Sequence, residues 1–132
     1  MSVFVDTSGL LAVLDATDEN HKEADEAWLA LLGGEEVLTT SNYVFVETFA
    51  LVQSRLGLKA AQTLAQDITP AFSIHWVEQA EHEAAVAAVL AGGKRRLSLV
   101  DCVSFEVMRR QGIRRSFAFD THFKEQGFDC IP

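Results

Sequence analysis

The chain alternates short apolar runs with longer stretches of helical periodicity, and this alternation is its strongest constraint on fold. The apolar runs are SVFV at residues 2–5, EVLTT at 36–40, SIHWV at 73–77, SFAF at 116–119 and FDCI at 128–131. Short runs rich in β-branched and aromatic residues are typical of strands buried on both faces of a parallel sheet. When such strands alternate with helices, the predicted fold is α/β, with helices on both faces of a central parallel sheet.

Helix signals fill the segments between these runs. Apolar residues recur there at helical spacing, hydroxyl or amide residues precede several segments, and glycine follows most of them. We expect helices at roughly residues 9–15, 20–32, 42–56, 58–68, 78–90, 99–111 and 121–126. No repeat, linker or low-complexity tract interrupts the pattern, so we expect residues 1–132 to form a single domain.

Composition excludes several classes of protein. A hydrophobic content of 48% and a charged content of 23% are ordinary for a soluble globular chain. No apolar run approaches the roughly 20 residues that a membrane span requires, and no signal peptide opens the chain. The two cysteines, Cys102 and Cys130, lack the spacing of a metal-binding pair. We therefore expect a reduced, cytoplasmic protein without membrane contact.

The net charge of −8 is distributed unevenly along the chain. Residues 1–90 carry three basic and fourteen acidic side chains, whereas residues 91–132 carry eight basic and five acidic ones. The basic residues of the second part form the clusters Lys94-Arg95-Arg96, Arg109-Arg110 and Arg114-Arg115. Such clusters are suited to binding phosphate, but they are equally typical of solvated loops and helix ends, and the sequence leaves both interpretations open.

Four acidic residues stand where an expected strand or helix meets a turn. Asp6 follows SVFV, Asp120 follows SFAF, Asp101 lies in the first turn of the helix at 99–111, and Glu47 lies in the second turn of the helix after EVLTT. The carboxyl ends of parallel strands and the starts of the helices that follow them share one edge of the sheet. We therefore expect all four carboxylates to reach one cleft.

Four carboxylates in one cleft repel each other strongly. Nearby helix N-termini stabilise each carboxylate by only about 0.3–1 kcal/mol, which is too little to hold them together. Without a cation, one or more of them must take up a proton. Mg²⁺ or Mn²⁺ resolves the conflict because both cations prefer oxygen ligands. The sequence thus predicts a divalent metal site, and the reaction that such a site favours is metal-assisted hydrolysis of a phosphodiester.

The motifs around these residues resemble those of a known family. VFVDTSGLL, TSNYVFVET, RLSLVDC and FDTHF are similar, in order and approximate spacing, to the acidic motifs of the PIN-domain ribonucleases. The short single-domain form resembles the VapC-type toxins of toxin–antitoxin pairs. The resemblance implies a three-layer α/β/α sandwich and a Mg²⁺- or Mn²⁺-dependent endoribonuclease that cleaves single-stranded or structured RNA. By motif position, the catalytic and metal-binding residues would be Asp6, Glu47, Asp101 and Asp120.

The resemblance also implies supporting groups and partners. A hydroxyl beside the first acid, from Thr7 or Ser8, and the hydroxyl of Ser98 would form hydrogen bonds around the metal ligands. Members of the VapC type usually form homodimers and are neutralised by a small antitoxin protein whose tail obstructs the acidic site. We therefore expect an RNA substrate, an antitoxin and a second copy of the chain as partners.

Two other functions remain open at this stage. In a phosphotransfer domain Asp6 would be the nucleophile, although position 8 is serine rather than a second aspartate. In a non-catalytic module the acidic cleft would bind only the basic tail of a partner. The histidines do not distinguish between these functions. His122, two residues after Asp120, is within reach of a substrate, but packing or capping is the favoured interpretation of a lone histidine there.

Overall fold

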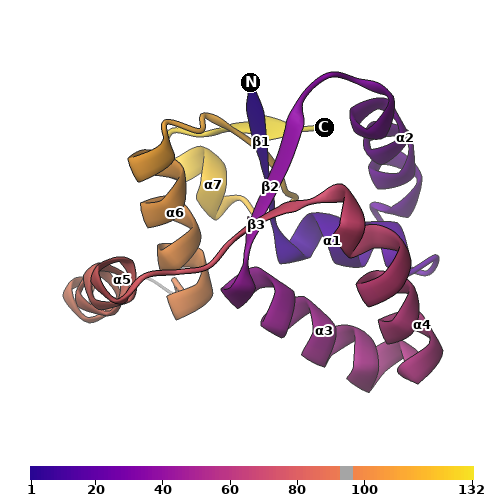
Figure 1. The fold of residues 1–132 in the computed structure, drawn as a ribbon, viewed down its shortest axis with the longest axis horizontal. Helices are drawn as coiled ribbons and strands as arrows, with labels where there is room; N and C mark the ends of the chain where they lie inside the picture. Colours follow the sequence, from indigo (N-terminus) through magenta and orange to yellow (C-terminus); the bar gives the residue numbers. More distant parts are fainter. Residues whose placement is uncertain (93–96) are drawn as a thin grey trace.

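The computed structural model describes residues 1–92 and 97–132, and these form three layers, helix, sheet and helix (Figure 1). Five parallel strands make the central sheet in the order β3-β2-β1-β4-β5. The strands are β1 (Ser2–Val5), β2 (Val37–Ser41), β3 (Ser73–His75), β4 (Arg115–Phe117) and β5 (Asp129–Ile131). The predicted three-layer α/β/α sandwich with a central parallel sheet is confirmed.

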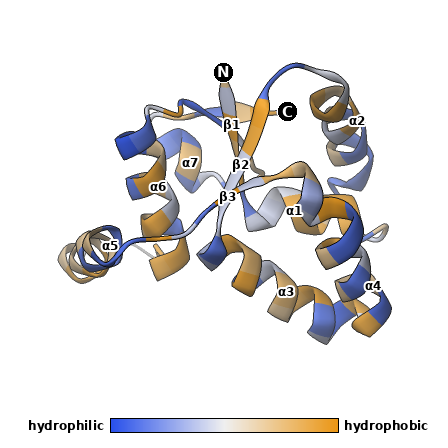
Figure 2. Ribbon diagram, in the orientation of Figure 1, coloured by the Kyte–Doolittle hydropathy of each residue, from blue (hydrophilic) through white to orange (hydrophobic). Residues whose placement is uncertain are grey.

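The helices cover both faces of the sheet. Figure 1 shows α1 to α4 on one side of the strands and α5 to α7 on the other. Their bounds are α1 (Thr7–Leu14), α2 (His21–Gly33), α3 (Asn42–Leu56), α4 (Leu58–Thr63), α5 (Gln79–Ala91), α6 (Leu99–Gln111) and α7 (His122–Glu125). Apolar and polar bands alternate along α3 and α6 in Figure 2, as expected of helices that bury one face against a sheet. No helix within residues 1–92 or 97–132 is long and apolar enough to cross a membrane.

β1 is the central strand of the sheet, and the order in which later strands are added changes sides at β1. β2 and β3 are added on one side of β1, whereas β4 and β5 are added on the other. Val3, Phe4 and Val5 are fully buried, which explains why this strand reads as an uninterrupted apolar run. In open α/β sheets, a crevice opens at such a reversal, outside the carboxyl ends of the strands.

Close packing holds the segment after β1 against β4. A Cβ atom added to Gly9 would lie 2.6 Å from the carbonyl oxygen of Phe117, so only glycine lets α1 approach β4 this closely. The backbone N–H of Asp6 donates to the same Phe117 carbonyl at 3.1 Å. On the other side, Thr40 Oγ1 donates to the Val5 carbonyl at 2.8 Å. The start of α1 is therefore fixed to both neighbouring strands.

Two predicted strands were too long at their carboxyl ends, and hydrogen bonds explain both differences. β3 ends at His75 rather than at residue 77, because the Val77 N–H donates to the side chain of Asn42. β4 ends at Phe117 rather than at residue 119, because the Phe119 N–H donates to Ser8 Oγ. The helix predicted for residues 58–68 has the predicted extent, but only Leu58–Thr63 is α-helical and Leu64–Ile68 is a π-helical turn. The basic run at residues 94–96 lies outside the described residues.

Candidate functional site

Asp6 begins the candidate site at the carboxyl end of β1. It is the N-cap of α1, and its Oδ2 accepts hydrogen bonds from the Ser8 backbone N–H at 3.1 Å and from Ser8 Oγ at 2.6 Å. Only 3% of the residue is exposed. The capping role is therefore present, but a capping aspartate normally faces water, whereas this carboxylate is desolvated.

Ser8 links Asp6 to the end of β4. Its hydroxyl donates to Asp6 and accepts from the backbone N–H groups of Phe119 at 3.0 Å and Asp120 at 3.3 Å. One side chain thus fixes the distance between two of the predicted ligands. Of the two hydroxyls considered beside the first acid, Ser8 is the one that contacts it. Thr7 instead accepts a hydrogen bond from Thr48 Oγ1 at 3.1 Å.

Asp101 enters the site from the first turn of α6. Its backbone N–H donates to Ser98 Oγ at 3.0 Å, and the Ser98 N–H donates back to Asp101 Oδ2 at 3.4 Å, which together form a capping box. Ser98 therefore positions Asp101, as the sequence predicted for a supporting hydroxyl. The side chain of Asp101 keeps 14% of its surface exposed, so it faces the site from a largely buried position.

Asp120 and His122 complete the arrangement from the turn that precedes α7. Asp120 Oδ1 accepts a hydrogen bond from the His122 backbone N–H at 2.9 Å. One ligand atom each from Asp101, Asp120 and His122 lie within 4.8 Å of one another, and the described residues contain no other such set of three. His122 thus lies beside the two carboxylates, and no feature of the sequence indicated this contact; a role for its ring beyond packing or capping stays a prediction.

Asp6, Asp101 and Asp120 form what we call the carboxylate cluster. Burial raises the pKa of Asp6 to about 6; the hydrogen bonds from Ser8 oppose this rise, and the charges of Asp101 and Asp120 add to it. Burial also raises the pKa of Asp101, and the charge of Asp120 raises it further. Within the described ranges, no Lys or Arg forms an ion pair with any of the three. The neighbouring basic group is His122, 3.0 Å from Asp120 and 3.7 Å from Asp101, and one histidine is not enough to balance three carboxylates. A divalent metal would relieve the repulsion that remains.

Glu47 is not part of the set of ligand atoms formed by Asp101, Asp120 and His122. It lies on α3 and lines an apolar pocket of about 290 Å³ together with Asn42, Tyr43, Val46 and Val100. Val100 directly precedes Asp101 in α6, so one side of this pocket comes from the helix that carries Asp101. The predicted convergence brings together Asp6, Asp101 and Asp120, and the ligand role of Glu47 stays a prediction.

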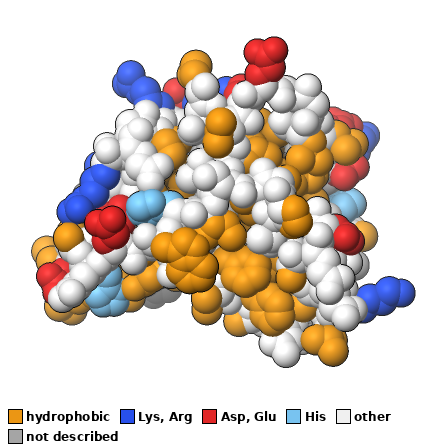
Figure 3. Space-filling model, viewed as in Figure 1, with side chains coloured by type: hydrophobic (Ala, Val, Ile, Leu, Met, Phe, Trp, Pro, Cys, Tyr) orange, Lys and Arg blue, Asp and Glu red, His pale blue; other side chains and the backbone are white. Residues whose placement is uncertain are grey.

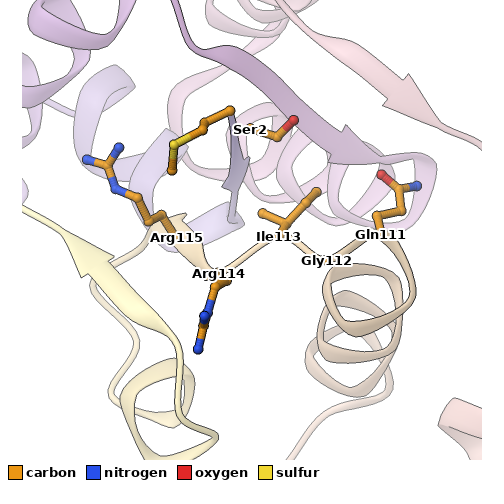
Figure 4. Close-up of a pocket in the computed structure, with 7 residues that line it drawn as sticks. Ser2, Gln111, Gly112, Ile113, Arg114 and Arg115 are labelled. Carbon is orange, nitrogen blue, oxygen red and sulfur yellow. The ribbon is translucent and has the colours of Figure 1, made fainter.

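A second cavity lies at the opposite edge of the sheet and has a different character. It has a volume of about 300 Å³ and is lined by residues that include Ser2, Gln111, Arg114 and Arg115 (Figure 4). Ser2 and Arg115 begin β1 and β4, so this cavity opens at the amino edge, away from the carboxylates. Arg115 is already paired with Glu36 at 2.6 Å. No carboxylate, histidine or cysteine is among the residues that line this cavity, so the carboxyl edge is the better candidate.

Comparison with known proteins gives separate evidence, which concerns the chain as a whole. The sequence model of the family described as "PIN domain" matches residues 3–129. The 23S rRNA-specific endonuclease VapC20 of two strains of Mycobacterium tuberculosis is 36% identical over 132 residues, covering 96% of this chain and 95% of that protein.

Several solved structures align with nearly the whole chain. The crystal structure of M. tuberculosis VapC20, described as a Sarcin-Ricin loop cleaving toxin, aligns with a TM-score of 0.89 at 34% identity, covering 99% of this chain and all of that one. FitAcB from Neisseria gonorrhoeae aligns with a TM-score of 0.70 at 18% identity, covering 98% and 96%. FitAB bound to a DNA fragment aligns with a TM-score of 0.69 at 18% identity, covering 98% and 93%. The last two likenesses concern the fold alone.

Proposed function

The chain belongs to the PIN-domain family, and from this membership and its carboxylate cluster we propose that it is a divalent-metal-dependent endoribonuclease. The observation that carries the proposal is the gathering of Asp6, Asp101 and Asp120 at one edge of the sheet, where among the described residues no Lys or Arg pairs with them and the neighbouring basic group is the single ring of His122. A purely structural site has no reason to keep such unfavourable charges together, whereas a metal-dependent hydrolase requires them.

The donor set fits Mg²⁺ or Mn²⁺. We propose that Asp6, Asp101 and Asp120 hold the metal and that Glu47 joins them from α3. A bound divalent cation would supply Lewis-acid stabilisation of the charge that develops on the phosphodiester. The chain's own contribution is placement. The Ser8 hydroxyl forms hydrogen bonds with both the Asp6 carboxylate and the Asp120 N–H, which fixes these two residues relative to each other. The Ser98 hydroxyl accepts a hydrogen bond from the Asp101 N–H at the start of α6.

The substrate that we propose is RNA, and ribosomal RNA is the first candidate. The support is the identity of 36% with a 23S rRNA-specific endonuclease over nearly the whole chain. The apolar pocket beside Glu47 gives a place for the base next to the cleaved phosphate. It combines the ring of Tyr43 with Val46, whose residue surface is 64% exposed. Flat apolar surfaces of this kind bind nucleobases by stacking, without regard to the phosphate charge.

On the basis of the same relatives, we propose that the chain acts as a toxin in the cytoplasm. The crystal structure with a TM-score of 0.89 is described as that of a toxin. We propose that a small antitoxin protein neutralises this chain by covering the acidic site with a basic tail. The acidic character of residues 1–90 favours such a partner.

We further propose that the chain acts as a homodimer. Figure 3 shows apolar side chains gathered across the lower part of one face, over β3 and α3. Among the apolar residues that stay exposed are Leu58 at 67% and Trp76 at 71%. Exposed apolar surface of this extent is typical of an interface rather than of a monomer's free surface. Light scattering coupled to size-exclusion chromatography measures the oligomer directly.

The decisive experiment uses purified protein with 23S rRNA, or an oligonucleotide of its sarcin–ricin loop, in Mg²⁺ or Mn²⁺. We expect cleavage that a chelator stops. We expect Asp101→Asn to lower the rate by more than about 100-fold, beyond the effect of a group that only supports a metal ligand. The control is Glu106→Gln on the same helix, where the carboxylate pairs with Arg110 at 2.7 Å and should not affect cleavage. Undiminished cleavage by a folded Asp101→Asn protein would contradict the proposal.

A further inference from the structure

The most unusual polar atom in the described part of the chain is Nδ1 of His122. It is shielded from solvent and has no hydrogen-bond partner. Yet it lies 3.0 Å from Asp120 Oδ1 and 3.7 Å from Asp101 Oδ2. A buried ring nitrogen beside two acidic side chains, without a hydrogen bond to either, requires a physical explanation.

Hydrogen bonding to Asp120 does not supply that explanation. Asp120 Oδ1 already accepts the backbone N–H of His122 at 2.9 Å, and the approach of the ring nitrogen to the same oxygen lacks hydrogen-bond geometry. A ring nitrogen that carries no proton presents a lone pair. Such a nitrogen carries partial negative charge, so at 3.0 Å from Asp120 Oδ1 and 3.7 Å from Asp101 Oδ2 it is repelled by both carboxylates. A cation bound by the three groups removes this repulsion.

We propose that His122 Nδ1 binds the divalent cation directly, beside Asp101 and Asp120, and that it makes the site prefer first-row transition cations to Mg²⁺. The inference rests on the proposed function, because it concerns the metal of the same site. The geometry supports it, since the three ligand atoms lie within 4.8 Å of one another and reach one position from two elements. The short turn in which Asp120 accepts the His122 N–H brings the two side chains to within 3.0 Å of each other.

The preference follows from ligand chemistry. Mg²⁺ favours oxygen ligands and keeps several of its waters, so an imidazole nitrogen adds little to its binding. Transition cations accept nitrogen readily, and affinity for such a site rises in the order Mn²⁺, Co²⁺, Ni²⁺. An all-carboxylate site has no comparable preference. His122 should therefore raise the affinity of the site for Mn²⁺ above that for Mg²⁺, and for Co²⁺ still more.

Calorimetry on the full chain tests the inference with MgCl₂, MnCl₂ and CoCl₂ as separate ligands. We expect His122→Ala to weaken Co²⁺ and Mn²⁺ binding by about 10-fold or more, with the larger loss for Co²⁺, and to change Mg²⁺ binding by less than about threefold. The visible spectrum of bound Co²⁺ should also change when its nitrogen ligand is lost. The matched control is His82→Ala, because His82 contacts the Tyr43 hydroxyl and not the cluster.

Three outcomes would overturn the inference. An equal loss for all three cations would show that the ring only positions the carboxylates, and no loss would show that it takes no part in binding. Wild-type protein that binds none of the cations would remove the metal site and the proposed function together. If the His122 effect is found but RNA is not cleaved, the proposed function fails and the ligand assignment stands. Thermal unfolding without metal shows whether His122→Ala is folded.

Discussion

Two neighbouring helices begin with the same local structure and have opposite electrostatic surroundings. α5 starts with a capping box formed by Glu78 and Glu81, and α6 starts with one formed by Ser98 and Asp101. Both boxes place a carboxylate at the third helical position. Glu81 is 4% exposed, and its Oε1 lies 2.8 Å from His75 Nε2 and accepts the Glu78 N–H at 2.9 Å. Asp101 instead faces Asp120 and Asp6.

The difference appears in the pKa of each group. Burial acts to raise the pKa of Glu81, but hydrogen bonds from Glu78 and His75 outweigh it and the pKa is lowered. Burial raises the pKa of Asp101, and Asp120 raises it further. A buried carboxylate with its own partners stabilises the fold, whereas a buried carboxylate that faces other carboxylates lowers stability. A site where carboxylates face one another lowers the stability of the fold, and such a site is a candidate for function.

The largest expected effect on stability concerns Asp6 in metal-free protein. Its pKa is about 6 in the folded chain and 3.8 in the unfolded one, so the folded state binds more protons between these pH values. Stability contributed by this group is therefore lost as pH rises from about 4 to about 6. The difference in pKa corresponds to about 3 kcal/mol. We expect Asp6→Asn to become more stable than wild type by up to this amount as pH rises to 7, measured by urea unfolding in a chelator.

Two controls sharpen the pH measurement. Asp129→Asn changes an exposed carboxylate at the other end of the sheet and should not alter the pH dependence of stability. Adding Mn²⁺ should raise the stability of wild type, because a ligand that binds only the folded state stabilises that state. It should not raise the stability of Asp6→Asn, which lacks one of the proposed metal ligands. A stability difference between Asp6→Asn and wild type that stays constant from pH 4 to pH 7 would show that Asp6 is not desolvated as the structure indicates.

The second prediction compares the two capping boxes directly. Glu81→Gln keeps the shape of the side chain but removes the charge that interacts with His75, and we expect it to destabilise the protein by about 1.5 kcal/mol. Asp101→Asn removes a charge that other carboxylates repel, so metal-free stability should stay the same or rise. Thermal unfolding of both variants at pH 7 shows whether each substitution lowers or raises the stability of the protein. Equal destabilisation by both substitutions would mean that the two regions do not differ.

The fold and the centre of the site could be predicted from sequence because each rests on short-range patterns. Apolar runs and capping residues placed the strands and helices, and the rule that parallel strands share a carboxyl edge brought Asp6, Asp101 and Asp120 together. His122 could not be predicted in the same way. Its position depends on a turn in which Asp120 accepts the His122 N–H, and nothing in the spacing indicates where the ring then points. β3 and β4 end two residues earlier than predicted, because side chains from distant segments, Asn42 and Ser8, accept the backbone N–H groups there.

The smallest expected effect concerns the pocket that joins the two regions. The Tyr43 hydroxyl contacts His82 of α5, next to Glu81, and the pocket that Tyr43 lines reaches Val100, next to Asp101. If a base of the RNA stacks there, removing apolar surface weakens ground-state and transition-state binding alike. We expect Val46→Ala to raise KM by about fivefold, or about 1 kcal/mol, and to leave kcat unchanged.

An abasic substrate separates a base contact from a general loss of RNA affinity. Oligonucleotides that lack one base beside the cleaved phosphate should raise the KM of the wild type about as much as Val46→Ala does. The same oligonucleotides should then have little further effect on Val46→Ala, because the surface that the base contacts is already reduced. Independent, additive losses would place the base elsewhere. In that case the exposed Val46 side chain is better explained by contact with the antitoxin or with a second copy of the chain, and the carboxylate cluster alone would define where RNA binds.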